Sequence, residues 1–224
     1  MSRREFDRQL EALRGAVVEL GETVLERLEA ASEALETGEE SLARRVIAGD
    51  DGVNERYLEI EGDCIDLFAL QQPVASDLRE VAGAYKISTD LERVGDLAVN
   101  VAEYALDLER ELYPEVPLAD LTETAQRMVD DAIAVYAESG DAWQCHDLAD
   151  RDTELDAMCA HAGEVITRAL LEHDAPDQAE IEGLVADVST LMLAVRDLER
   201  VGDHAVNIAA RTLYITESDD SLLE

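Results

Sequence analysis

Basic residues, and lysine above all, are scarce in this chain. Its 224 residues include 53 Asp and Glu against 18 Lys and Arg, Lys86 is the only lysine, and the net charge is −35. Such a surface repels nucleic-acid phosphates, so DNA and RNA are not expected as partners. Abundant carboxylates with little lysine are expected of a protein that works in concentrated salt, where screening removes the self-repulsion. The composition therefore indicates a halophilic source.

Cysteines and long apolar runs are also rare. The three cysteines are odd in number and show no CxxC spacing, so they predict reduced core thiols rather than disulfides or a thiolate zinc site. No apolar run approaches the length of a membrane span, and the N-terminus lacks the apolar segment of a signal peptide. We therefore expect a cytoplasmic protein without direct membrane insertion.

Proline and glycine are few as well, with four and twelve residues, and no segment alternates apolar and polar residues as a strand does. The sequence predicts an all-α protein. Apolar residues recur every three or four positions from Leu10 to Leu35, which is typical of a helix with one buried face. Six helices are expected, at about 2–36, 39–70 with a bend at 49–52, 76–112, 118–138, 141–173 and 176–214.

The most informative pattern is an internal repeat. Residues 90–100 read DLERVGDLAVN and residues 197–207 read DLERVGDHAVN, so ten of eleven positions agree at an offset of 107. Two prolines within 113–117 stop one helix and separate it from the next. The chain is therefore predicted to form two tandem antiparallel three-helix bundles, residues 1–112 and residues 113–224.

Oxygen-bearing side chains four residues apart lie above one another on a helix. Such pairs flank the apolar stripes of two helices in each half: Asp50 with Asn54 and Glu92 with Asp96 in the first, and Asp152 with Asp156 and Glu199 with Asp203 in the second. If the two pairs of a half meet, their like charges require a multivalent cation. All-oxygen ligation favours hard ions such as Mg²⁺, Mn²⁺ or ferric iron. Because Asn54 replaces a carboxylate, the first site is expected to be the weaker unless Glu55 takes its place.

Two further observations bear on this hypothesis. Gly95 and Gly202 stand in mid-helix, where each costs about 1 kcal/mol relative to alanine, so a neighbouring helix is expected to approach closely there. The acidic pairs could instead be solvated or paired with nearby arginines. The acidic pair Glu29 and Glu33, however, has no counterpart in the other half, whereas Glu92 with Asp96 and Asp50 with Asn54 do.

The segment ALQQPVASDLR at 69–79 and the two DLERVGD motifs make the chain resemble the PhoU family. The resemblance implies two three-helix bundles side by side, each with a metal site built from E(D)xxxD motifs. It points to two sets of ligands: Asp50, Glu92 and Asp96, and Asp152, Asp156, Glu199 and Asp203, with Asn100 and Asn207 as candidates for further ligands. The expected cofactor is a multivalent metal ion bound by oxygen ligands, with Fe, Mn, Mg and Zn as the candidates.

The resemblance also implies a role. PhoU-like proteins regulate phosphate uptake and phosphate-starvation signalling through the ATPase subunit of the phosphate ABC transporter and, where present, a sensor histidine kinase. A homodimer is expected on the same grounds. These expectations concern the family and do not follow from the periodicity of the chain.

Two other classes of protein remain as alternatives. The first is a helical adaptor without metal, whose acidic rows would bind a basic partner. The second is a carboxylate-bridged di-metal enzyme, which usually needs Glu-x-x-His motifs that this sequence lacks. No enzymatic activity is therefore expected. His204 follows Asp203, and a surface or packing role is favoured for it over metal ligation.

Overall fold

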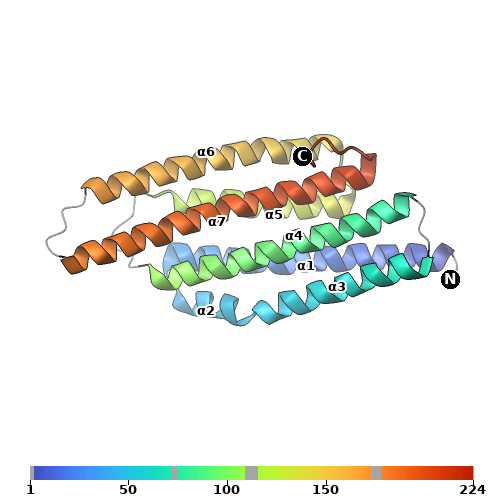
Figure 1. Cartoon of the computed structure of the whole chain (residues 1–224), viewed down its shortest axis with the longest axis horizontal. Coiled ribbons are helices and arrows are strands. Elements are labelled where there is room, and N and C mark those ends of the chain that lie inside the picture. The colour runs from blue at the N-terminus through green and yellow to red at the C-terminus, as the bar shows by residue number, and fades with distance from the viewer. Residues whose placement is uncertain (1–2, 72–74, 109–115, 173–177, 224) are drawn as a thin grey trace.

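The computed structural model describes residues 3–71, 75–108, 116–172 and 178–223, and over these ranges the chain is helical with short connections and no strand (Figure 1). The helices are α1 (Arg3–Thr37), α2 (Glu40–Ala48), α3 (Asp50–Gln71), α4 (Ala75–Asp107), α5 (Leu118–Glu138), α6 (Ala142–Glu172) and α7 (Gln178–Glu217). The predicted all-α class is confirmed. No helix in the described part of the chain is long and apolar enough to cross a membrane.

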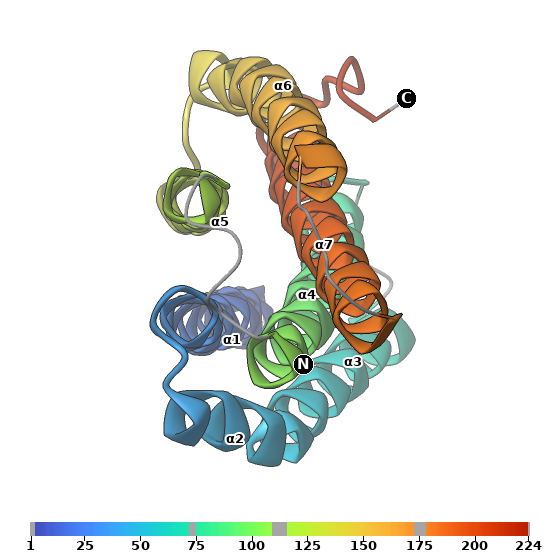
Figure 2. The same cartoon turned by 90° about the vertical axis from the view of Figure 1, so that its left-hand side faces the viewer.

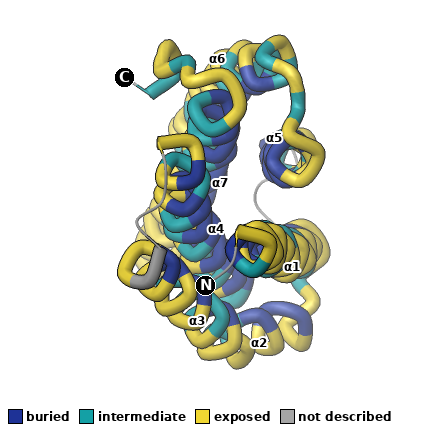
Figure 3. Tube along the Cα trace, turned by 90° about the vertical axis from the view of Figure 1, so that its right-hand side faces the viewer, coloured by how far each residue is buried: buried dark blue, intermediate teal, exposed yellow. Residues whose placement is uncertain are grey.

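Within the described residues, the first half contributes four helices, because its second predicted helix is divided into α2 and α3, and the second half contributes three. In the first half α4 packs on α1 and on α2–α3, and in the second half α7 packs on α5 and α6. The central helices α4 and α7 lie against each other, and α1 lies against α5 on one side of them (Figure 2). Buried residues face inward from both halves and form one continuous apolar cluster (Figure 3). The predicted boundary between residues 112 and 113 lies outside the described residues.

The periodicity of α1 explains its place in the core. The stripe from Leu10 to Leu35 is buried, and its members follow one another at intervals of three or four residues. The helix ends at Thr37, where Gly38 adopts a φ of 74°, a left-handed conformation that glycine tolerates best. Both the buried face and the end of this helix are confirmed.

The second predicted helix is broken rather than bent, so it appears as α2 and α3. Gly49 separates the two, and a Cβ atom there would lie 2.8 Å from Nη1 of Arg27. Nη2 of Arg27 donates to the carbonyl oxygen of Val46 at 2.8 Å and to Oδ1 of Asp50 at 3.4 Å. The guanidinium therefore adds a second hydrogen bond to the carbonyl oxygen of Val46, which also accepts from the N–H of Gly49, and it faces the acidic start of α3.

The halves are joined by reciprocal hydrogen bonds along α4 and α7, which run antiparallel. Asp90 of α4 meets Nδ1 of His204 at 2.9 Å and accepts from Asn207 at 3.4 Å. Asp197 of α7 accepts from Asn100 and, with the same oxygen, from the hydroxyl of Tyr104, each at 3.0 Å. We call these residues the seam: Asp90, Asn100, Tyr104, Asp197, His204 and Asn207. Since Asp90 and Asn100 occupy the same repeat positions as Asp197 and Asn207, the two Asp–Asn hydrogen bonds exchange under a pseudo-two-fold axis.

Candidate metal centre

The two acidic rows of the second half meet where α6 crosses α7. A Cβ atom on Gly202 would lie 2.6 Å from Cδ2 of Leu155 and 2.9 Å from Oδ1 of Asp152, closer than real Cβ contacts allow. In the first half a Cβ atom on Gly95 would lie 3.2 Å from Cγ1 of Val53. Both glycines therefore permit the close helix approach that their mid-helix positions predict.

Asp152 is the most perturbed carboxylate of this crossing. Its Oδ1 atom is buried and has no hydrogen-bond partner. Burial, followed by the negative charges of Asp156, Asp203 and Glu199, raises the pKa of Asp152 from 3.8 to about 6. A buried, unpaired carboxylate oxygen is unfavourable in the isolated protein, and a bound cation would satisfy it.

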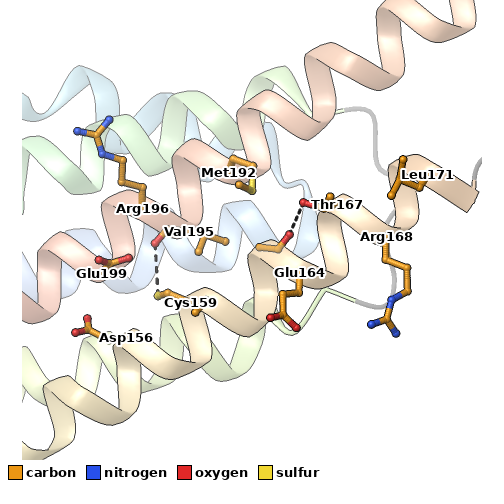
Figure 4. A pocket seen from close by; sticks show the side chains of 12 residues that line it. Asp156, Cys159, Glu164, Thr167, Arg168, Leu171, Met192, Val195, Arg196 and Glu199 are labelled. Carbon is orange, nitrogen blue, oxygen red and sulfur yellow. Dashed lines mark hydrogen bonds between the residues drawn. The ribbon is translucent and has the colours of Figure 1, made fainter.

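The other three carboxylates are close enough to act electrostatically on Asp152. Burial and the charges of Asp156 and Asp203 raise the pKa of Glu199, and burial and Asp156 raise the pKa of Asp203. Asp156 is exposed on α6, and its side chain points toward Glu199 across the space between α6 and α7 (Figure 4). The four side chains therefore form one electrostatically coupled group.

The four carboxylates lie near one another, but they are not arranged as the ligands of one ion. Over the described ranges, no three His, Cys, Asp or Glu side chains already stand in positions that could hold an ion. Like charges separate when no cation lies between them, and the exposed side chains of Asp156 and Asp203 have room to rotate. The donor set, all carboxylate oxygens with one of them buried and unpaired, fits a hard multivalent cation.

The first half arranges the equivalent residues differently. Asn54 donates to Oδ2 of Asp50 at 3.0 Å, while Arg27 reaches Oδ1 of the same carboxylate. Both oxygens of Asp50 are thus engaged with the protein. Burial and neighbouring carboxylates still raise the pKa of Glu92 and of Asp96, with Arg93 opposing both shifts. An ion here would have to displace a hydrogen bond and compete with a guanidinium.

Sequence reasoning missed two features near these sites. Arg27 gave no signal, because it lies 23 residues before Asp50 on another helix. The sequence does carry a signal for Asp90 and Asp197, because each stands within an apolar stripe, as in the run Asp90, Val94 and Leu97. Asn100 and Asn207, expected as further ligands, direct their amides to these two aspartates instead. His204 also lies in the seam, in agreement with the favoured packing role.

The fold and the paired rows define a class: a helical tandem-repeat protein with oxygen-rich helix crossings in each half. The PhoU domain profile matches residues 17–105 and 118–212, and the chain therefore belongs to the PhoU family.

Its relatives match over nearly the whole chain. It is 34% identical over 213 residues to the phosphate-specific transport system accessory protein PhoU homolog 1 of Thermotoga maritima, covering 94% of this chain and 88% of that protein. It is 32% identical over 219 residues to the phosphate-specific transport system accessory protein PhoU homolog of Pseudomonas aeruginosa, covering 96% of this chain and 87% of that protein.

Solved structures agree. The crystal structure of PhoU from Pseudomonas aeruginosa superposes with a TM-score of 0.87 at 30% identity, covering 96% of this chain and all (100%) of that one. The phosphate transport system regulatory protein PhoU from Streptococcus pneumoniae gives a TM-score of 0.86 at 25% identity, covering 96% and 98%.

Proposed function

We propose that this protein regulates phosphate uptake and phosphate-starvation signalling, binds a multivalent metal ion at its second-half helix crossing, and acts through the ATPase subunit of a phosphate ABC transporter. The regulatory part rests on membership of the PhoU family and on the names of its relatives, which are accessory proteins of phosphate-specific transport systems. The protein would act in the cytoplasm, as a non-enzymatic component.

The metal part rests on one observation, the buried Oδ1 atom of Asp152 that has no partner and lies against Gly202. Asp156, Glu199 and Asp203 would complete the ligand set, with Fe, Mn, Mg or Zn as the ion. The cation would neutralise the mutual repulsion that raises the pKa of Asp152. Asp50, Glu92 and Asp96 would form a weaker second site, because Asn54 and Arg27 already engage Asp50.

Metal content tests this assignment. Protein purified without chelator at high salt should contain a multivalent metal, measured by inductively coupled plasma mass spectrometry, and Glu199→Ala with Asp203→Ala should lose most of it. The matched control is Glu29→Ala with Glu33→Ala, an exposed i, i+4 pair on α1 that removes the same charge. Equal metal content in both double variants would show that the assigned residues do not bind the ion.

The regulatory role is tested separately in cells. Deleting the gene should raise phosphate-transporter expression or phosphate uptake when phosphate is plentiful. A pull-down from phosphate-replete cytoplasm at native salt should recover the transporter ATPase and, where the organism has one, the sensor histidine kinase. An unchanged phosphate response in the deletion strain would contradict this role whatever the metal content.

A metal-free adaptor is the second candidate, and it is favoured by the finding that the described carboxylates are not assembled into a ligand cage. In that case the acidic rows would bind a basic face on the partner. Recovery of the transporter ATPase would then be insensitive to chelator but sensitive to added salt, because exposed charge pairs are screened.

A further inference from the structure

The first crossing, of α3 with α4, and the second crossing, of α6 with α7, are alike on the side of the central helix. Residues 92–96 of α4 and residues 199–203 of α7 have the same sequence, ERVGD. Each crossing therefore receives one glutamate, one arginine and one aspartate from its central helix. Because this arginine is common to both crossings, it does not explain why they differ. The cause lies on the helices packed against α4 and α7.

These outer helices can be matched by contacts and by their ends. The Cβ position of Gly95 lies against Val53, and that of Gly202 lies against Leu155, which gives an offset of 102 between α3 and α6. The same offset relates the first aspartates of the two acidic pairs.

α1 and α5 end in the same way. The residue that follows each helix has a left-handed backbone, with a φ of 74° at Gly38 and of 53° at Ser139. The resulting offset of 101 matches Arg27 of α1 with Met128 of α5. At this place one half therefore has a cation and the other an uncharged side chain.

Arg27 brings its charge to the first crossing. Its side chain is only 13% exposed, and Nη2 donates to the carbonyl oxygen of Val46 at 2.8 Å and to Oδ1 of Asp50 at 3.4 Å. The guanidinium fits because residue 49 is glycine, whose Cβ position lies 2.8 Å from Nη1. The amide of Asn54 donates to Oδ2 of Asp50 at 3.0 Å, so both carboxylate oxygens are engaged.

Met128 brings no charge to the second crossing. Its Cε atom lies 3.5 Å from the Cβ position of Gly202, and Oδ1 of Asp152 lies 2.9 Å from the same position without a hydrogen-bond partner. In the first half, no atom of Asp50 is nearer than 4.0 Å to the Cβ position of Gly95. The carboxylate beside Arg27 is thus farther from the central helix than the carboxylate beside Met128.

The second half does have an arginine next to its aspartate, but this arginine is bound elsewhere. Arg151 stands at the place of Gly49 by the offset of 102. Its guanidinium donates to Asp131 and, at 2.8 Å and 3.0 Å, to Asp147. It gives no hydrogen bond to Oδ1 of Asp152, which therefore keeps an oxygen for an ion.

We propose that the guanidinium of Arg27 takes the place of a multivalent metal ion at the first crossing, and that this arginine decides which of the two crossings is loaded with metal. A metal–oxygen bond is about 2.0–2.6 Å long, so an ion on Oδ1 of Asp50 would lie beside a guanidinium nitrogen that is 3.4 Å from the same atom. The two positive charges would repel each other.

The exchange of Asp156 for Asn54 is the smaller difference, because an amide oxygen still serves as a ligand for hard cations. The inference rests on the metal chemistry proposed above for these carboxylates, and it names the residue that selects between the crossings.

The experiment counts ions in full-length variants at native salt. Each protein is loaded with Mn²⁺, freed of unbound ion by gel filtration and measured by inductively coupled plasma mass spectrometry, and the electron paramagnetic resonance signal of free Mn²⁺ gives the affinity. Arg27→Met with Asn54→Asp copies the second crossing and should hold one more ion per chain than the native protein. Asn54→Asp alone should bind the added ion at least tenfold more weakly.

Two further variants separate the charge of Arg27 from other effects. Arg27→Lys with Asn54→Asp keeps a cation at this place and should also bind the added ion at least tenfold more weakly than the Met variant. Arg44→Met with Asn54→Asp removes the same charge from a side chain of α2 that is 68% exposed, and it should gain no ion. If the Met variant does not fold, Arg27→Gln with Asn54→Asp replaces it, because glutamine keeps an N–H donor and loses the charge.

Three outcomes would overturn the inference. They are a native Mn²⁺ content that falls when Glu92 and Asp96 become Ala, a folded Met or Gln variant that gains no ion, and an equal gain in Asn54→Asp alone. The native count tests the second crossing separately. A native protein without metal whose Arg27 variant gains an ion would refute the second-half assignment and support the role of Arg27, whereas one native ion without any gain would do the reverse.

Discussion

Asp152 offers the sharpest test, because its carboxylate should destabilise the metal-free protein and stabilise the metal-bound one. The perturbation is Asp152→Asn, which keeps the shape of the side chain and removes the charge. Raising the pKa of a carboxyl group from 3.8 to about 6 corresponds to about 3 kcal/mol for an unscreened group. Because Asp152 is only partly buried and three of its neighbours are carboxylates near water, we expect about 1–2 kcal/mol after screening.

The sign follows from proton binding. Between about pH 4 and about pH 6 the folded protein holds a proton on Asp152 that the unfolded chain has released, so the native protein loses stability as pH rises through this window. Asp152→Asn does not titrate. In chelator the variant should therefore be more stable than the native protein at pH 7, and the difference should vanish below about pH 4.

Urea unfolding at constant salt, followed by circular dichroism, measures this difference. The control is Asp150→Asn, an exposed position on the same helix that removes the same charge. Metal should reverse the order: an ion at a hundredfold excess over its Kd adds about 2.7 kcal/mol to the native protein and little to the variant. A variant that is less stable than the native protein in chelator at pH 7 would refute this account of the site.

Three other predictions concern packing, the seam and salt. Gly202→Ala should lower the free energy of unfolding by about 1–3 kcal/mol, because its Cβ would collide with Leu155. The control Gly15→Ala, whose Cβ would meet nothing within 4 Å, should raise the free energy of unfolding by about 0.5–1 kcal/mol. Equal effects of the two substitutions in urea unfolding would contradict the close crossing. Asp197→Ala should cost about 2–4 kcal/mol, because it leaves the hydroxyl of Tyr104 and an amide without their acceptor; a loss below about 0.5 kcal/mol by the same assay would show that the seam contributes little. The melting temperature should rise steadily as KCl increases from about 0.1 M, where screening reaches about 10 Å, to above 1 M, where it reaches about 3 Å; a flat profile would argue against a chain adapted to salt.

The helices were predictable because their signal is local and repeated. The apolar stripe from Leu10 to Leu35 identifies the buried face of α1 without information from any other helix, and Gly38 marks the end of α1. The bend expected near Gly49 is a break between α2 and α3, and a contact that is not local accompanies it. Arg27, from a different helix, occupies the space beside Gly49 and donates to the carbonyl oxygen of Val46.

The candidate site was also predictable only as far as its residues form patterns along a single helix. The repeat located Glu199 and Asp203, and the i, i+4 spacing located Asp152 and Asp156, because both are patterns along one helix. Which oxygen lacks a partner depends on how α6 meets α7, and no spacing along one helix contains that information. The same limit hid the hydrogen bond between Tyr57 and Tyr85, since the two residues lie on different helices.

The seam between α4 and α7 has the form of an isologous interface, in which residue i contacts j and the equivalent of j contacts the equivalent of i. When such an interface joins two identical subunits, a substitution changes the site in both subunits at once. A single chain that carries both copies is free of that constraint. It can therefore keep Asp156 in one copy and Asn54 in the other, and one protein can present two related helix crossings with different chemistry.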